Sequence, residues 1–132
     1  MKKETIRTLL DIQPGEPETT RVRVARLGLE IQLKELPYDK LTSLRGVEDS
    51  NLNYLLSSTV EPNFRDKAWY REHMGCPTPV DALKKLLRPG EVTALVRRLD
   101  RLNGYAPGAV LDVEEDLSGK AIEDALEDLE KN

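Results

Sequence analysis

Residues 19–34 read TTRVRVARLGLEIQLK, and this stretch decides the fold class. Apolar residues alternate with charged or polar ones on both sides of a glycine, at Val22, Val24, Leu29, Ile31 and Leu33. An alternation of period two on both sides of a turn is typical of a β-hairpin. Gly28 can supply the backbone conformation that other residues resist in such a turn. The stretch therefore predicts two antiparallel strands joined at Leu27-Gly28.

Helices are expected to cover this hairpin, because an isolated hairpin is at best marginally stable in water and its apolar face needs a second layer. Outside residues 19–34, proline and glycine separate segments in which apolar residues recur at helical spacing. We expect helices near residues 3–12, 37–46, 50–61, 65–75, 78–88 and 92–102, and one more after Ser118.

Three local patterns set the details of these helices. One apolar stripe is formed by Leu52, Leu55, Leu56 and Val60. Thr78-Pro79 is a strong helix start, because threonine can cap a helix and proline fits its first turn. Pro89-Gly90 is interpreted as a break, after which the most regular helix of the chain begins at Val92.

Together these patterns predict a mainly α (α+β) fold: a small helical domain with one N-terminal β-hairpin packed on it. At 132 residues the chain has the length of one domain with one hydrophobic core. We divide it into an N-terminal helix and linker (1–18), a helical core domain with the hairpin (19–106), and an acidic C-terminal segment with an amphipathic helix (107–132).

Charge is distributed unevenly along the chain. The net charge is −4, but residues 112–132 hold nine acidic and two basic residues, a net of −7, so the remainder carries +3. A terminal block of like charge is typical of a solvated segment or an interaction tail. Because such a block repels phosphates and the body is only weakly basic, we expect no nucleic-acid partner.

The arginines of the helix that starts at Val92 nevertheless keep a DNA-binding regulatory protein among the alternatives. Arg97, Arg98 and Arg101 lie on its polar side. Reading bases would require a recognition helix rich in amide and hydroxyl side chains, with more basic neighbours for the phosphates. Here the arginines stand beside acidic residues, which is typical of a solvated face.

Few residues are suited to catalysis or metal binding. His73 and Cys76 are the only histidine and the only cysteine, and a zinc site needs three or four protein ligands. His73 could act as the base for a Cys76 thiol, but no further pattern supports this pairing. The acids Glu114-Glu115-Asp116 lack the spacing of a calcium loop. We therefore expect no catalytic residue, no metal and no cofactor, and an enzyme is the disfavoured alternative.

The chain also lacks the marks of export or membrane insertion. No apolar run approaches the roughly 20 residues needed to cross a bilayer. The basic start is not followed by the apolar stretch of a secretion signal. One cysteine cannot form an intrachain disulfide. We expect a cytoplasmic protein without a membrane partner.

Five motifs, in order, resemble one protein family. They are RLG at 26–28, the segment 53–66 with VEPN at 60–63, TPVDAL at 78–83, LLRPGEV at 86–92, and the helix closed by LNG at 102–104. Their order and spacing resemble the XkdN-like phage tail assembly chaperones over most of residues 20–105. The resemblance implies a non-catalytic chaperone that binds the tape measure protein during tail assembly. It brings no catalytic residues with it.

Partners follow partly from this resemblance and partly from the apolar stripes. The tape measure protein is the expected partner, with the tail tube protein and a second copy of the chain as further candidates. After Ser118, apolar residues recur at helical spacing among acids, and we expect three of them to contact a partner or a second copy: Ile122, Leu126 and Leu129. A structural tail subunit is the main alternative, since it would use the same kind of surface.

Overall fold

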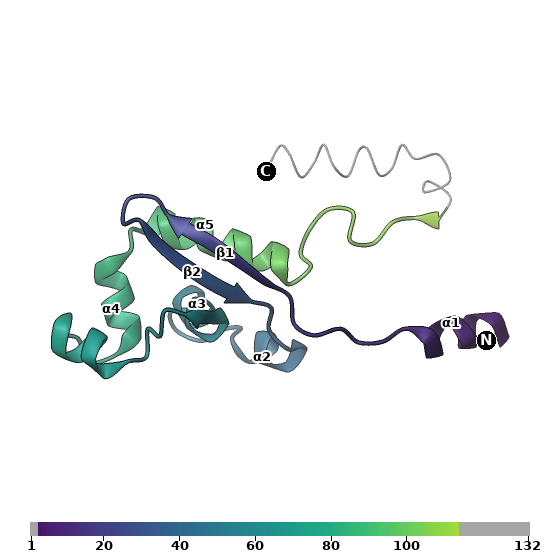
Figure 1. Ribbon diagram of the computed structural model, residues 1–132, viewed down its shortest axis with the longest axis horizontal. Coiled ribbons are helices and arrows are strands. Elements are labelled where there is room, and N and C mark those ends of the chain that lie inside the picture. Colours follow the sequence, from purple (N-terminus) through teal and green to yellow (C-terminus); the bar gives the residue numbers. More distant parts are fainter. Residues whose placement is uncertain (1–2, 114–132) are drawn as a thin grey trace.

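The computed structural model describes residues 3–113, and within them the α+β fold class is confirmed. Helices dominate, and a small antiparallel sheet lies near the N-terminus of the chain (Figure 1). The elements are, in order, α1 (Lys3–Asp11), β1 (Thr19–Val24), β2 (Leu29–Lys34), α2 (Tyr38–Ser43), α3 (Ser50–Ser58), β3 (Thr59–Glu61), the π-helix η1 (Ala68–His73), α4 (Pro79–Leu86) and α5 (Pro89–Leu102).

The predicted hairpin is present. β1 and β2 pair antiparallel, with Val22 opposite Ile31 and Val24 opposite Leu29. Gly28 has a φ of 61°, a left-handed conformation that favours glycine in the turn. The alternation therefore gives the sheet one apolar face, which is directed at the helices, and one face that carries arginines and acids.

A third strand was not predicted. The sheet order is β1-β2-β3, and β3 pairs antiparallel with β2 through Leu33 opposite Thr59. The assignment of Val60 to the helical stripe is therefore wrong: α3 ends at Ser58, and Val60 is exposed in β3. Thr59 adopts an extended conformation and pairs with Leu33 of β2, and its Oγ1 donates to the carbonyl of Leu55, 2.7 Å away.

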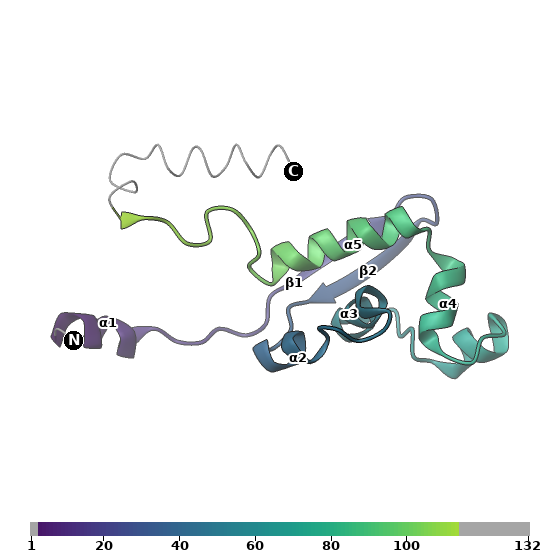
Figure 2. The same cartoon turned by 180° about the vertical axis from the view of Figure 1, so that it is seen from behind.

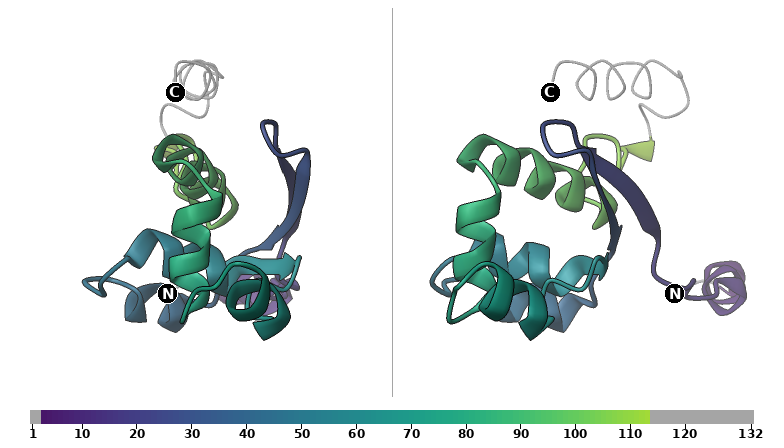
Figure 3. Two further views of the ribbon diagram at one scale, coloured as in Figure 1. Left: turned by 90° about the vertical axis from the view of Figure 1, so that its left-hand side faces the viewer. Right: turned by 60° about the vertical axis from the view of Figure 1, so that its left-hand side comes forward.

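The helices form a layer against the apolar face of the sheet. α3 packs on α4 and on α5, and α5 also contacts β1 and β2. Figure 3 shows α5 running beside the hairpin, with α4 leading down to η1 and α3 beneath. Figure 2 shows the same arrangement from behind.

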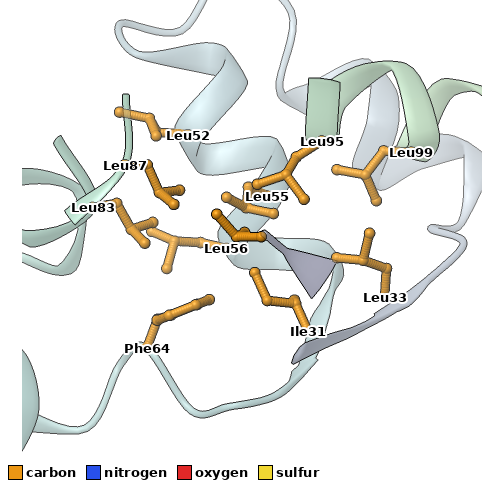
Figure 4. Close-up of a cluster of buried hydrophobic side chains, with 11 residues drawn as sticks. Ile31, Leu33, Leu52, Leu55, Leu56, Phe64, Leu83, Leu87, Leu95 and Leu99 are labelled. Carbon is orange, nitrogen blue, oxygen red and sulfur yellow. The ribbon is translucent and has the colours of Figure 1, made fainter. Parts of the chain in front are cut away.

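The core lies where α3, α4, α5 and β2 meet (Figure 4). Five aliphatic side chains in it have essentially no exposed surface: Ile31, Leu33, Leu55, Leu83 and Leu99. Around them pack Val24, Leu52, Leu56, Phe64, Leu87 and Leu95. A smaller second cluster joins η1 to α4 through Tyr70, Cys76 and Ala82.

The starts of α4 and α5 are the best-defined helix ends. Thr78 caps α4 as predicted, since its Oγ1 accepts the backbone N–H of Asp81, 3.2 Å away. The predicted break between the two helices is present, but it lies at Leu87-Arg88, and Pro89-Gly90 form the first turn of α5, so this helix begins three residues before Val92. Proline is compatible with this position, since its missing N–H has no partner in a first turn.

Two further predicted helices, at 37–46 and 65–75, are shorter than their sequence patterns, and the one expected after Ser118 lies outside the described residues. The segment 65–75 contains only the turn of π-helix at η1. The segment 37–46 contains only α2, after which Gly46 has a φ of 73°. Among residues 3–113, no helix combines the length and the apolar composition that crossing a membrane requires.

Candidate partner-binding surfaces

Helix α1 carries an apolar face that the rest of the described chain does not cover. Ile6, Leu9 and Leu10 lie on one side of this nine-residue helix, with 39%, 58% and 71% of their surface exposed. Glu4, Arg7 and Asp11, spaced i, i+3 and i+7, occupy the opposite side of the helix, so α1 is strongly amphipathic.

The position of α1 explains why this face is open. The segment 12–18, which contains two prolines and a glycine, leads away from β1 and is exposed throughout. Figures 1 and 2 show α1 apart from the layered body of the molecule. A helix of this length is marginally stable in water unless its apolar face is packed. The free energy of α1 therefore falls when a partner covers Ile6, Leu9 and Leu10.

The stripe at the other end of the chain cannot be compared with its prediction. Ile122, Leu126 and Leu129 lie outside the described residues. Their role as partner contacts stays a prediction.

A groove between the edge of the sheet and α5 is the second surface of interest. It has a volume of about 620 Å³ and lies between β1 and the side of α5 that faces β1. Its floor is made by Val22, Val24 and Leu95, and exposed Ala94 stands on its helical wall. Because β1 is an edge strand, every second backbone N–H and C=O of β1 points away from β2 and toward this side.

Arginines surround the apolar floor of this groove. Arg21 and Arg23 project from β1, Arg26 from the hairpin turn, and Arg98 from α5. Glu30 lies 3.5 Å from Arg21 and 3.1 Å from Arg23, so one carboxylate is shared by two guanidinium groups. The groove is therefore basic.

Arg26 fixes the hairpin turn to the junction of α4 and α5. Its Nη2 donates to Glu91 Oε1 and to the Leu86 carbonyl, each 2.8 Å away, and its Nε donates to Glu91 Oε2 at 3.1 Å. The Arg88 N–H also donates to Glu91 Oε1 at 2.8 Å. The hydrogen bonds from Arg26, and then from Arg88, lower the pKa of Glu91 from its ordinary value of 4.5 to about 2.

This contact predicts an acid-dependent loss of stability. Glu91 has a lower pKa when the chain is folded, so its contribution is fully present above about pH 4.5 and is lost as the pH falls through about 2. Thermal unfolding of the wild type and of Glu91→Gln at stepped pH values measures this. We expect the two melting temperatures to converge between pH 4.5 and 2.

The control for this prediction is Glu72→Gln, which removes one exposed carboxylate from η1. The difference in melting temperature between Glu72→Gln and the wild type should vary less between pH 4.5 and 2. If the difference in melting temperature between the wild type and Glu91→Gln stays constant down to pH 2, the stabilising role of the Glu91 carboxylate is contradicted.

The structure separates the two residues with the best potential for chemistry. His73 is exposed at the end of η1, whereas Cys76 is buried in the cluster with Tyr70 and Ala82. The Cys76 thiol donates to the carbonyl of Met74 at 3.5 Å. Within residues 3–113, no three His, Cys, Asp or Glu side chains are grouped as a metal site requires.

A polar network ties α3, α5 and the end of the hairpin together. Tyr54 Oη donates to Asp100 Oδ1 at 3.2 Å and accepts from Asn103 Nδ2 at 2.8 Å. Asn103 Oδ1 accepts the N–H of Leu36 at 2.8 Å. Burial raises the pKa of Tyr54 above its ordinary value of 10, so the hydroxyl keeps its proton. This network is structural, and it explains why Asn103 closes α5.

The same network changes the interpretation of the α5 arginines. Asp100 is bonded to Tyr54 and Glu91 to Arg26, so neither acid pairs with Arg97, Arg98 or Arg101. In the part of the chain from 3 to 113, no carboxylate lies within 4 Å of the nitrogens of these arginines. Of the three, Arg98 lines the groove.

The groove itself was missed by sequence analysis. Its walls come from residues that are about 70 positions apart in the chain, at β1 and α5. The alternating arginines at 21 and 23 mark the outer face of β1, but no local pattern reveals that α5 adds Arg98 beside them.

Comparison with known proteins identifies related sequences and one related fold. A family model described as "Phage XkdN-like tail assembly chaperone protein" matches residues 46–118. A crystal structure of the protein yqbn is similar at a TM-score of 0.55 and 20% sequence identity, over 70% of this chain and 89% of that one. A likeness at this level of identity shows the fold alone. A search of curated proteins found no match.

Proposed function

The chain belongs to the XkdN-like phage tail assembly chaperones, and we propose that it binds the tape measure protein while the tail is being built. It acts by binding alone and catalyses no reaction. The observation that carries the proposal is the uncovered apolar face of α1, formed by Ile6, Leu9 and Leu10.

The geometry of α1 suits the recognition of a helical partner. Ile6, Leu9 and Leu10 are spaced i, i+3 and i+4, which is the pattern of anchors that an amphipathic helix places into an apolar groove. A tape measure protein, which is long and helical, exposes such apolar surface before the tail tube surrounds it. A short helix with flexible aliphatic anchors binds surfaces of this kind reversibly, as a chaperone requires.

The linker supports this role. Residues 12–18 are exposed and contain Pro14 and Pro17, so they act as a semi-rigid spacer between α1 and the core domain. Binding at α1 therefore does not require the core domain to rearrange. The core can remain folded while α1 docks on different segments of a partner.

Two further aspects belong to the same proposal. The chain works in the cytoplasm of the bacterial host, where tails are assembled. The tail tube protein and a second copy of the chain are secondary partners. A structural subunit of the finished tail is the competing function, but no feature of the described residues favours it over a chaperone.

Co-expression tests the proposal. The cognate tape measure protein is produced alone and together with the full chain, and its soluble fraction is measured after centrifugation of the lysate. We expect most of the tape measure protein to be insoluble alone and soluble with the chain, and the two to co-purify through a tag on the chain. Equal solubility with and without the chain, and no co-purification, reject the proposal.

A further inference from the structure

We infer that the basic groove between β1 and α5 is the docking site of the acidic residues 114–132 of the same chain. The inference assigns an intramolecular contact to Ile122, Leu126 and Leu129, in place of the partner or second copy that the sequence suggests. It does not depend on the proposed binding of the tape measure protein.

The groove has the composition that an acidic amphipathic segment requires. Its apolar floor, with Val22, Val24 and Leu95, lies between arginines on both walls. Arg21 and Arg23 stand on the strand side, and Arg98 stands on the helix side. A ligand seated here buries apolar side chains in the centre and presents negative charge to both rims.

Residues 114–132 match this composition. They hold eight acidic and two basic residues, a net charge of −6, and Ile122, Leu126 and Leu129 recur at helical spacing. At that spacing Glu123 and Glu130 flank the apolar stripe on one side, and an aspartate at 128 flanks it on the other. The arrangement of charge on either side of the stripe is complementary to that on either side of the groove floor.

The ion pairs of the groove leave positive charge for a ligand. Glu30 is shared by Arg21 and Arg23, and Glu91 is taken by Arg26. Arg98 has no carboxylate within 4 Å among residues 3–113. Two carboxylates thus face four guanidinium groups around the groove.

Covalent connection favours the chain's own segment over other acidic ligands. The groove is lined by Ala94, Leu95 and Arg98 of α5, and the acidic segment follows α5 after the stretch 103–113. The described chain ends at Val113, and the eight residues between it and Ile122 allow roughly 30 Å of extended chain, which exceeds the roughly 21 Å length of the 14-residue α5. A tether of this kind raises the effective concentration of the segment to roughly the millimolar range.

Docking of this segment also covers the open backbone edge of β1. An edge strand with open backbone N–H and C=O groups can pair with the strands of other molecules, and native proteins often cover such an edge with another part of the chain. Residues 114–132, lying along the groove, would cover β1 in this way.

Paramagnetic relaxation on the full chain tests the inference. Cys76→Ala removes the native thiol, and Glu127→Cys carries a nitroxide on the side of the segment away from its apolar stripe. We expect the label to broaden the backbone amide signals of β1 and of α5 around Ala94 and Arg98. The groove variant is Ala94→Glu with Arg98→Glu, and the control is Thr93→Glu with Arg97→Glu.

The two variants make the same charge change at exposed positions of one helix, and only the first lies in the groove. In the groove variant, two glutamates replace Ala94 and Arg98, so the acidic segment is repelled where it was attracted. We therefore expect the groove variant to lower the docking equilibrium constant by about tenfold, and the control to leave it within about twofold. Salt near 1 M, where the Debye length is about 3 Å, should weaken the broadening.

Three results overturn the inference. The first is the absence of broadening at the groove in the spin-labelled chain whose groove residues are unchanged. The second is equal broadening in the groove variant and the control. The third comes from mixing spin-labelled chain without isotope with isotope-labelled chain without spin label: broadening in this mixture as strong as in the doubly labelled chain places the segment on a second copy.

Discussion

Leu55→Ala is expected to lower the free energy of unfolding by about 2–5 kcal/mol, because it removes a fully buried side chain from the centre of the core. Leu55 lies on α3 among Leu83, Leu99 and Ile31, where α4, α5 and β2 converge (Figure 4). Side chains from this many elements cannot all move inward to fill the cavity. The loss is a large part of the roughly 5–15 kcal/mol that stabilises a typical domain.

Urea denaturation followed by circular dichroism measures this effect, and Leu10→Ala is the matched control. Leu10→Ala is the same chemical change and also lies in a helix, but 71% of the surface of Leu10 is already exposed on α1. We expect the free energy of unfolding of Leu10→Ala to stay within about 0.5 kcal/mol of the wild-type value. Equal midpoints for Leu55→Ala and Leu10→Ala would show that the core does not lie where α3 meets α4 and α5.

Replacing the apolar face of α1 is expected to abolish binding of the tape measure protein while leaving the core folded. The variant combines Ile6→Ser, Leu9→Ser and Leu10→Ser. Each of these side chains contributes roughly 1.5–3 kcal/mol when it becomes fully buried. Losing all three therefore raises Kd by about a thousandfold or more. The measurement is binding of the purified full chain to a soluble tape measure fragment by titration calorimetry.

The control combines Glu4→Ser, Arg7→Ser and Asp11→Ser on the opposite side of the same helix. Both variants contain the same number of serines, so they weaken the helix to a similar degree. We expect the control to bind within about tenfold of the wild type, and both variants to unfold at the wild-type urea midpoint. Wild-type affinity in the apolar-face variant contradicts the role of α1. An equal loss in both variants assigns the effect to helix formation rather than to the apolar face.

Most of the fold was predicted from local sequence patterns, because each pattern acts through residues that are close together in the chain. The alternation around Gly28 places one face of the hairpin in the core, and a shift of register by one residue would expose all of it. Thr78 caps α4 through a bond to Asp81, which is only three residues away. Such short-range signals can be recognised without knowing the tertiary structure.

The errors arose where distant contacts decide the outcome. β3 is only three residues long, and it is a strand because β2 offers it an edge, so Val60 could not be assigned from its neighbours. Pro89-Gly90 can end one helix or begin the next. Which of the two occurs depends on Glu91. Its carboxylate accepts hydrogen bonds from the Arg88 N–H and from the guanidinium group of Arg26 in the hairpin turn.

The two candidate surfaces, the apolar face of α1 and the groove, also differ in how much of each can be predicted from the sequence. The amphipathic pattern of α1 is visible in the sequence, but its exposure is a property of the fold, since a stripe of this kind usually packs on its own domain. The groove is a tertiary feature, because β1 and α5 bring its arginines together from opposite ends of the core domain. For the stripe at Ile122, Leu126 and Leu129, the sequence shows the pattern, and the spin-label experiment tests the contact.

The central claim is that the chain holds the tape measure protein during assembly and leaves before the tail is complete. Quantitative mass spectrometry of two samples from one infected or induced culture tests it most directly: material captured by a tag on the chain from the lysate, and purified finished tails. We expect the tape measure protein to be enriched with the chain in the first sample, and the chain to be absent from the second. A chain present in finished tails in a fixed ratio to the tape measure protein, or captured without it from the lysate, would contradict the account.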